Sequence, residues 1–170
     1  VDIIHTLNVD DNLAPAVSGS LTAANVEGCS VANAPAAVTT VAALQALPGG
    51  IQITDACPED GNLTVTSTQT STGTCPIVIT RTYKVTDGWL NTSVDIIHTI
   101  NVDDNLAPAV TGSLNVTNIE GCAVGAAPAA VTTVAALEAL PGSLQITDAC
   151  TTDGNLVVTN TQTSTGTCPI

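Results

Sequence analysis

The chain has 170 residues, of which 15 are Asp or Glu and only two are Lys or Arg, so its formal net charge is −13. Such a charge repels nucleic acid and anionic membrane surfaces, so we expect no nucleic-acid partner and favour cations as ligands. No apolar run approaches the ~20 residues of a membrane span, so we expect no membrane insertion in this segment.

The first element recurs later in the chain and reveals an internal repeat. Residues 1–17 return as residues 94–110 with one substitution, and of the 77 positions that can be compared in this register, 61 are identical. A period of 93 residues is too long for a solenoid unit and suits a small autonomous domain. We therefore predict that residues 1–10 are the last strand of a preceding repeat and that 11–103 are a complete repeat. Residues 104–170 would then be a second repeat that lacks its last two strands.

Two interpretations of the chain ends stay open. The chain is either a window from a longer polymer, which we favour, or a molecule whose open sheet edge is completed by the opening strand of another copy. In either case we expect the partners to be neighbouring repeats and other copies of the chain.

Within one repeat the pattern is mostly that of strands. Residues 20–26 alternate loosely and predict a first strand, and Thr40 then caps a short helix that ends at Pro48 and Gly49. Residues 51–54, 63–70, 76–86 and 93–102 are rich in Thr and β-branched residues and predict four more strands. Several short strands in about 90 residues indicate an all-β sandwich.

Three segments carry a resemblance to a known family. ITDAC at 53–57, GTCPIVITRTYKVTDG at 73–88 and residues 91–108 resemble the hyaline-repeat and related immunoglobulin-like modules of very large surface proteins of Bacteroidota-type bacteria. The resemblance spans the whole repeat and implies an Ig-like sandwich, an extracellular or cell-surface location, and a role in adhesion or in a fibre. Those modules have a TDxCGN turn, whereas Trp89 replaces the cysteine here.

Each repeat contains three cysteines, so one is left over. If the strands alternate in direction, Cys29 and Cys75 lie at one end of the repeat and Cys57 lies at the other. We therefore predict the disulfides Cys29–Cys75 and Cys122–Cys168.

The resemblance implies that Cys57 and its counterpart Cys150 have lost their usual partner, because the family's cysteine is Trp89 in this chain. Either these two are buried free thiols that pack as small hydrophobes, or they form disulfides with a neighbouring repeat or another chain.

An acidic segment marks the joint between repeats. Two Asp residues and an Asn stand at 10–12 and again at 103–105, each followed by a proline, and the segment is similar to the calcium-binding linker of cadherins. The strand directions place this linker beside turns that contain further Asp residues, and Ca²⁺ takes roughly six to eight oxygen ligands. A solvated turn is the alternative, since Asp and Asn are common in turns. The candidate calcium ligands are Asp10, Asp11, Asp55, Asp60, Asp87, Asp103, Asp104, Asp148 and Asp153.

The remaining polar residues favour packing over chemistry. His5 and His98 share the apolar face of their strand, so we expect packed histidines, and we expect Arg81 and Lys84 to pair with nearby acids. No nucleophile motif, phosphate loop or zinc motif is present in the sequence, so we predict that the chain is not an enzyme.

Two classes of function remain. The first is a structural repeat of an extracellular fibre, stalk or giant adhesin, since near-identical units give near-identical joints. The second is a module that binds a carbohydrate or a cell-surface ligand, with calcium as a candidate cofactor. One Trp and one Tyr leave little aromatic surface for sugar binding, so we favour the first class.

Overall fold

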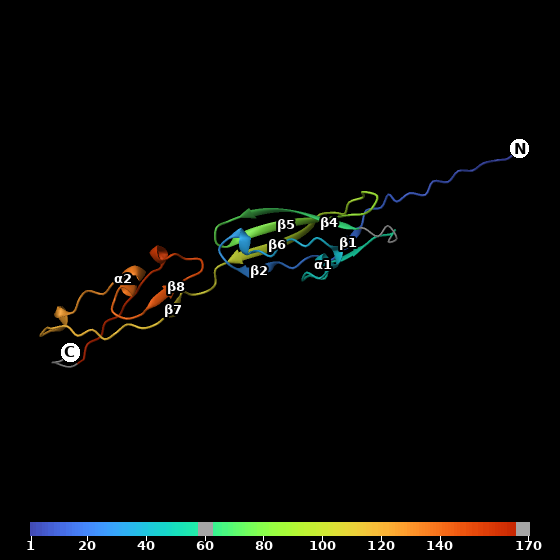
Figure 1. Cartoon of the computed structure of the whole chain (residues 1–170). Helices are drawn as coiled ribbons and strands as arrows, with labels where there is room; N and C mark the ends of the chain where they lie inside the picture. Colours follow the sequence, from blue (N-terminus) through green and yellow to red (C-terminus); the bar gives the residue numbers. More distant parts are fainter. Residues whose placement is uncertain (58–62, 166–170) are drawn as a thin grey trace. The chain divides into compact units, whose positions relative to one another are not determined.

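The computed structural model describes residues 1–57 and 63–165 (Figure 1). The chain divides into two units, Val1–Asp104 and Asn105–Ile170. It is β-rich with two short α-helices, α1 and α2.

The first unit is built on a four-stranded sheet with the order β2-β6-β5-β4. Its strands are β2 (Ala24–Glu27), β4 (Thr64–Thr72), β5 (Ile77–Thr86) and β6 (Ile96–Asp103). The β4–β5 and β5–β6 pairs are antiparallel, whereas β2 runs parallel to β6. The predicted alternation of directions along the chain gives β2, β4 and β6 one direction and β5 the opposite direction. These pairings therefore confirm it in this unit.

A smaller layer faces this sheet. Strands β1 (Ala16–Ser18) and β3 (Gln52–Thr54) form an antiparallel pair, and helix α1 (Val41–Gln45) precedes β3. The helix begins where predicted, because the Thr40 side chain accepts a hydrogen bond from the Ala43 amide at 3.2 Å.

The predicted strand at residues 20–26 is confirmed only in its second half, which is part of β2. Residues 19–23 are not a strand and connect β2 to β1, which belongs to a different sheet and was not predicted. This connection passes close to the end of the helical segment, where the Thr22 amide donates to the Pro48 carbonyl at 2.8 Å. A Cβ on Gly49 would lie 2.2 Å from the Ser20 carbonyl oxygen, so only glycine fits this close approach.

The core has two apolar clusters, and the larger one lies between the sheet and the layer of β3 and α1. Alternate residues of β5 and β6 point inward and are buried, as period-two strands require. The larger cluster contains Leu44, Tyr83 and Val85, and the smaller one contains Ile79 and Ile100.

The second unit has fewer strands. It contains the pair β7 (Ala109–Thr111) and β8 (Gln145–Thr147) and helix α2 (Val134–Glu138), which repeat β1, β3 and α1. Residues 117–120 and 157–165, which are equivalent to β2 and β4, are not strands. Residues 105–165 contain no counterpart of β5 and β6, so these segments have no partner strands with which to form a ladder.

Residues 1–10 show the same dependence on partners. They differ from 94–103 at one position, yet they form no strand here and their apolar side chains are exposed, with Ile3 at 93% and Val9 at 98%. In β6 the equivalent Ile96 and Val102 are 4% and 1% exposed. The strand predicted at residues 1–10 is therefore not formed, and no described strand pairs with this segment.

Candidate functional site

Three of the predicted calcium ligands come together in the first unit. Asp11, Asp55 and Asp87 each offer one carboxylate oxygen, and these oxygens all lie within 4.8 Å of one another. Asp11 directly follows residues 1–10, Asp55 follows β3, and Asp87 follows β5. Strands β3 and β5 end at this edge of the unit, so the strand directions bring the carboxylates together.

Two of the carboxylates are held by one oxygen only. Asp11 Oδ1 accepts from the Leu13 amide at 3.1 Å, and Asp55 Oδ1 accepts from the Cys57 amide at 2.9 Å. The Oδ2 atoms of Asp11 and Asp55 are buried and accept no hydrogen bond from the described residues. Buried acceptors without a donor are rare in native proteins, because each one has lost its hydration without replacement.

The third carboxylate organises the loop between β5 and β6. Asp87 is 5% exposed; its Oδ1 accepts from the Trp89 amide at 2.9 Å and the Asn91 amide at 2.8 Å, and its Oδ2 accepts from Asn91 Nδ2 at 2.8 Å. Burial raises the pKa of the Asp87 carboxyl, but the hydrogen bonds from Asn91, Trp89 and Leu90 outweigh burial and hold the pKa below its usual value. Asp87 is therefore an anion at neutral pH.

Asn91 connects this loop to the start of the repeat. Its Nδ2 also donates to the backbone carbonyl of Asp11 at 3.2 Å, so one amide bridges two of the three carboxylate residues. Sequence reasoning did not identify Asn91. The sequence signal that could have identified it is its position four residues after Asp87, at the end of the turn that contains Trp89.

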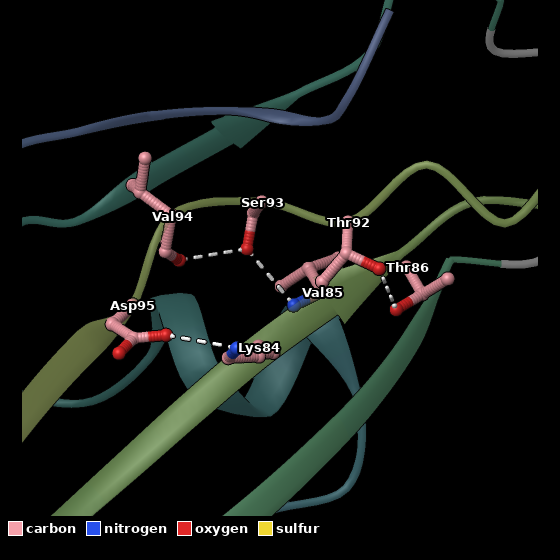
Figure 2. Close-up of polar contacts among 7 residues, drawn as sticks. All are labelled: Lys84, Val85, Thr86, Thr92, Ser93, Val94 and Asp95. Carbon is pink, nitrogen blue, oxygen red and sulfur yellow. Dashed lines mark hydrogen bonds and ion pairs between the residues drawn. The ribbon is translucent and has the colours of Figure 1, made fainter. Parts of the chain in front are cut away.

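The base of the loop is fixed by short polar contacts (Figure 2). Ser93 Oγ accepts from the Val85 amide at 3.0 Å and donates to the Val94 carbonyl at 2.9 Å. The hydroxyls of Thr86 and Thr92 lie 3.1 Å apart. These contacts limit the positions that the loop, and therefore Asp87, can adopt.

An ion pair lies beside the same base. Lys84 Nζ is 3.3 Å from Asp95 Oδ1, which confirms the prediction that Lys84 pairs with a nearby acid (Figure 2). Both side chains are about half exposed, so the pair contributes little to stability.

The other predicted calcium ligands that the structure describes do not join this cluster. Asp10 and Asp153 are exposed, Asp104 is half-buried, and Asp60 lies outside the described residues. Asp148 Oδ1 accepts from the Cys150 and Thr151 amides at 2.9 and 2.7 Å, and these bonds lower its pKa. It thus repeats the turn made by Asp55 but is not one of the three carboxylates.

The predicted pairing of Cys29 with Cys75 was wrong. Cys75 is an exposed free thiol, and its Sγ donates to Asp103 Oδ1 at 3.2 Å. The two cysteines do lie at the same end of the sheet, but β6 separates β2, which precedes Cys29, from β5, which follows Cys75. Two strand spacings amount to roughly 10 Å, which exceeds the Cα separation that a disulfide can span.

The other cysteines also differ from the prediction. Among the described residues, Cys29 and Cys150 are disulfide-bonded, so Cys150 is not an unpaired cysteine. Cys122 is free and exposed, so it does not form the predicted bond to Cys168, which lies outside the described residues. Cys57 is exposed and not buried.

A polar pair lies inside the core of the first unit. Arg81 and His98 face each other across β5 and β6, and each is 5% exposed. Packing of His98 was predicted, but Arg81 was expected to pair with an acid. Its guanidinium instead donates to Gln69 Oε1, at 2.7 Å from Nη2, and to the Pro35 carbonyl at 2.9 Å.

Comparison with known proteins gave no match: no family model, curated protein or solved structure is similar to this chain at a significant level. Among the described residues, no helix has the length and apolar character needed to cross a membrane.

Proposed function

We propose that the chain is part of a structural repeat protein, an extracellular fibre, stalk or giant adhesin built from Ig-like modules of 93 residues at the bacterial cell surface. In this proposal each module is a rigid spacer, and function arises from the number of modules and the stiffness of their joints.

The observation that carries the proposal is the short connection between consecutive repeats. The central strand β6 ends at Asp103, and the next strand, β7, begins at Ala109. The five residues between them, 104–108, make a short connection that includes a proline, whereas a flexible tether is usually longer and rich in Gly and Ser. The 61 identities in 77 positions mean that successive joints have nearly the same sequence.

The cysteines support an extracellular location. Disulfides persist in oxidising compartments and are rare in the cytosol, and Cys29 and Cys150 are disulfide-bonded.

An adhesive module is the second candidate, and one observation favours it. Trp89 and Leu90 are 56% and 82% exposed on the loop that Asp87 organises. Leu90 has a φ of +72°, a conformation that costs a bulky residue free energy. An exposed apolar tip in a strained loop is an arrangement used for ligand contact.

Electron microscopy of tandem arrays separates the two candidates. Arrays with increasing numbers of the 93-residue period should appear as filaments whose contour length increases by a constant step. Arrays that collapse into globules of variable shape would contradict the spacer. Reproducible binding on a glycan array that is lost in the Trp89→Ala variant would favour the adhesive module.

A further inference from the structure

We infer that the open side of strand β4, here called the β4 edge, joins two copies of the chain as an antiparallel pair, with Thr68 of one copy opposite Thr68 of the other. Strand β4 is the last strand in the order β2-β6-β5-β4 and pairs with β5 on one side. Among the described residues no strand pairs with its other side, and every β4 side chain except that of Val65 is exposed. The edge is therefore accessible to a further strand.

The β4 edge lacks the features that protect exposed strands. Native proteins block such edges with short strands, charges, prolines or bulges, because an open edge recruits other strands. The opposite edge of the sheet is protected in this way, since β2 has four residues and ends in Glu27. Strand β4 has nine residues without a charge, a proline or a glycine, and its pairing with β5 contains no bulge. An unprotected edge of this length is suited to strand addition.

The hydrogen bonds of Val85 show which backbone groups of β4 face the open side. The Val85 amide donates to Ser93 Oγ at 3.0 Å and its carbonyl accepts from the Ser93 amide at 2.8 Å, so this backbone faces the β6 side. Because successive residues face opposite sides of a strand, Lys84 and its partner Thr66 face each other within the β4–β5 ladder. The backbone groups left for the open side belong to Val65, Ser67, Gln69 and Ser71.

These four residues determine the register of a symmetric pair. All four are used only when residue 65 lies opposite 71 and residue 67 lies opposite 69, which centres the pair on Thr68. On the outer face threonine then lies opposite threonine throughout: 64 opposite 72, 66 opposite 70, and 68 opposite itself. Threonine pairs are favourable across strands, and the β4 segment brings no like charges together, although the whole chain carries a net charge of −13. A second copy therefore matches the β4 edge at every position.

Pairing at the β4 edge joins two four-stranded sheets into one sheet that crosses two chains. Pairing of two chains does not depend on the proposed function, but its consequence for a fibre rests on it. An array carries one β4 edge for each complete repeat, so contacts that are weak singly add up between two arrays. The proposed fibres would then associate side by side.

Sedimentation equilibrium of the 170-residue chain, from micromolar to millimolar concentration, measures this association. We expect a reversible equilibrium between monomer and dimer. Alkylation of the exposed thiols of Cys75 and Cys122 before the measurement excludes dimers that are linked by a disulfide.

Amide hydrogen exchange at residue level locates the contact. In dilute protein the amides of Ser67, Gln69 and Ser71 should exchange fast, whereas those of Thr66 and Thr68, which face β5, should exchange slowly. In concentrated protein the first three should become protected as well. Equal exchange of these three amides at both concentrations would contradict a contact at the β4 edge.

Thr68→Lys is the decisive variant, because it places like charges opposite each other at the centre of the pair and keeps the backbone of β4 intact. It should weaken dimerisation by a factor of about ten or more, since like charges directly opposite destabilise a strand pair. It should melt like the wild type, because Thr68 is exposed. Thr68→Glu should behave in the same way. An equimolar mixture of the two variants should dimerise again, because opposite charges then meet at the centre.

Two further variants complete the test. Ile97→Lys is the matched control: Ile97 is 47% exposed on the same face of the sheet but lies on β6, two strands from the edge, so this variant should dimerise like the wild type. Ser67→Pro removes an amide that faces the open side and keeps the ladder with β5, so it should abolish the dimer without unfolding the sheet.

Three results would overturn the inference. They are a wild-type chain that stays monomeric at millimolar concentration, a dimer that persists undiminished in Thr68→Lys, and a mixture of Thr68→Lys and Thr68→Glu that fails to associate. None of them would alter the filament length of single tandem arrays, so the two proposals fail separately.

Discussion

The buried histidine of the first unit should make its stability depend on pH near neutrality. Burial of His98 lowers the pKa of its imidazole below 6.5, and the positive charge of Arg81 lowers it further; a weaker contact with the Thr22 backbone acts in the opposite direction. Neither ring nitrogen makes a hydrogen bond of ordinary geometry within the described structure. Arg81 on β5 is the charged group that faces the ring, and the neighbouring β2 side chains that point inward, Ala24 and Val26, are apolar.

The linkage between proton binding and folding gives the direction in which the free energy of unfolding changes with pH. Below pH 6.5 the unfolded chain binds a proton at His98 that the folded unit does not, so the free energy of unfolding decreases as pH falls. The decrease is about 1.4 kcal/mol for each pH unit below 6.5, until the pH reaches the lowered pKa of the folded state. Asp87 and Asp148 also have lowered pKa values, but their effect begins near pH 4, because the unfolded carboxyl titrates near 3.8.

Urea denaturation followed by far-UV circular dichroism between pH 8 and 5, in EDTA, measures this slope. His98→Gln should make stability nearly independent of pH above 5, whatever its absolute stability. His5→Gln is the matched control, because His5 holds the equivalent position one repeat earlier but is exposed, and it should keep the wild-type slope. A wild-type unfolding free energy that is constant between pH 7.5 and 5.5, or an unchanged slope in His98→Gln, would refute the reasoning.

Three substitutions test the packing. Gln69→Ala should destabilise the first unit by about 1–3 kcal/mol in urea denaturation, because it leaves the buried Arg81 guanidinium without its main acceptor; the double change with Arg81→Met should recover most of this loss. Leu44→Ala should lower the free energy of unfolding by about 2–5 kcal/mol, since Leu44 is fully buried. Leu137→Ala, at the equivalent position in the second unit, should lower it less, because Leu137 is half-buried. Equal losses would contradict the difference between the units. Gly49→Ala should lower the melting temperature, because its φ is +130° and the new methyl would meet the Ser20 carbonyl, and a neutral result would show that the connection can move.

Local signals in the sequence predicted much of the fold. The Thr40 cap and the proline that follows located α1, and β-branched alternation located β4, β5 and β6. These features depend on interactions between residues close in sequence or on a single buried face, which a pattern records directly.

Features that depend on distant partners were missed. The pairing of Cys29 with Cys75 failed because it required the order of strands across the sheet as well as their direction. The buried state of Arg81 was overlooked although its position, between Ile79 and Tyr83 in a period-two strand, places it on the inward face.

The acidic cluster shows both cases at once. Strand directions correctly brought Asp11, Asp55 and Asp87 to one end of the repeat. The same reasoning included Asp10, which is adjacent to Asp11 in sequence but is exposed and lies outside the cluster, because side-chain direction is not encoded in spacing along a linker.

The central claim is that the 93-residue period is a complete structural unit, joined end to end with its neighbours. Hydrogen exchange of the 170-residue chain extended at its carboxyl end by a copy of residues 78–103 tests this claim most directly, since the copy supplies the second unit with counterparts of β5 and β6. We predict that amides in residues 117–120 and 157–165, which form no strand in the present structure, become protected to the level of β2 and β4. Exchange in these segments that stays as fast as in the original chain would contradict the claim.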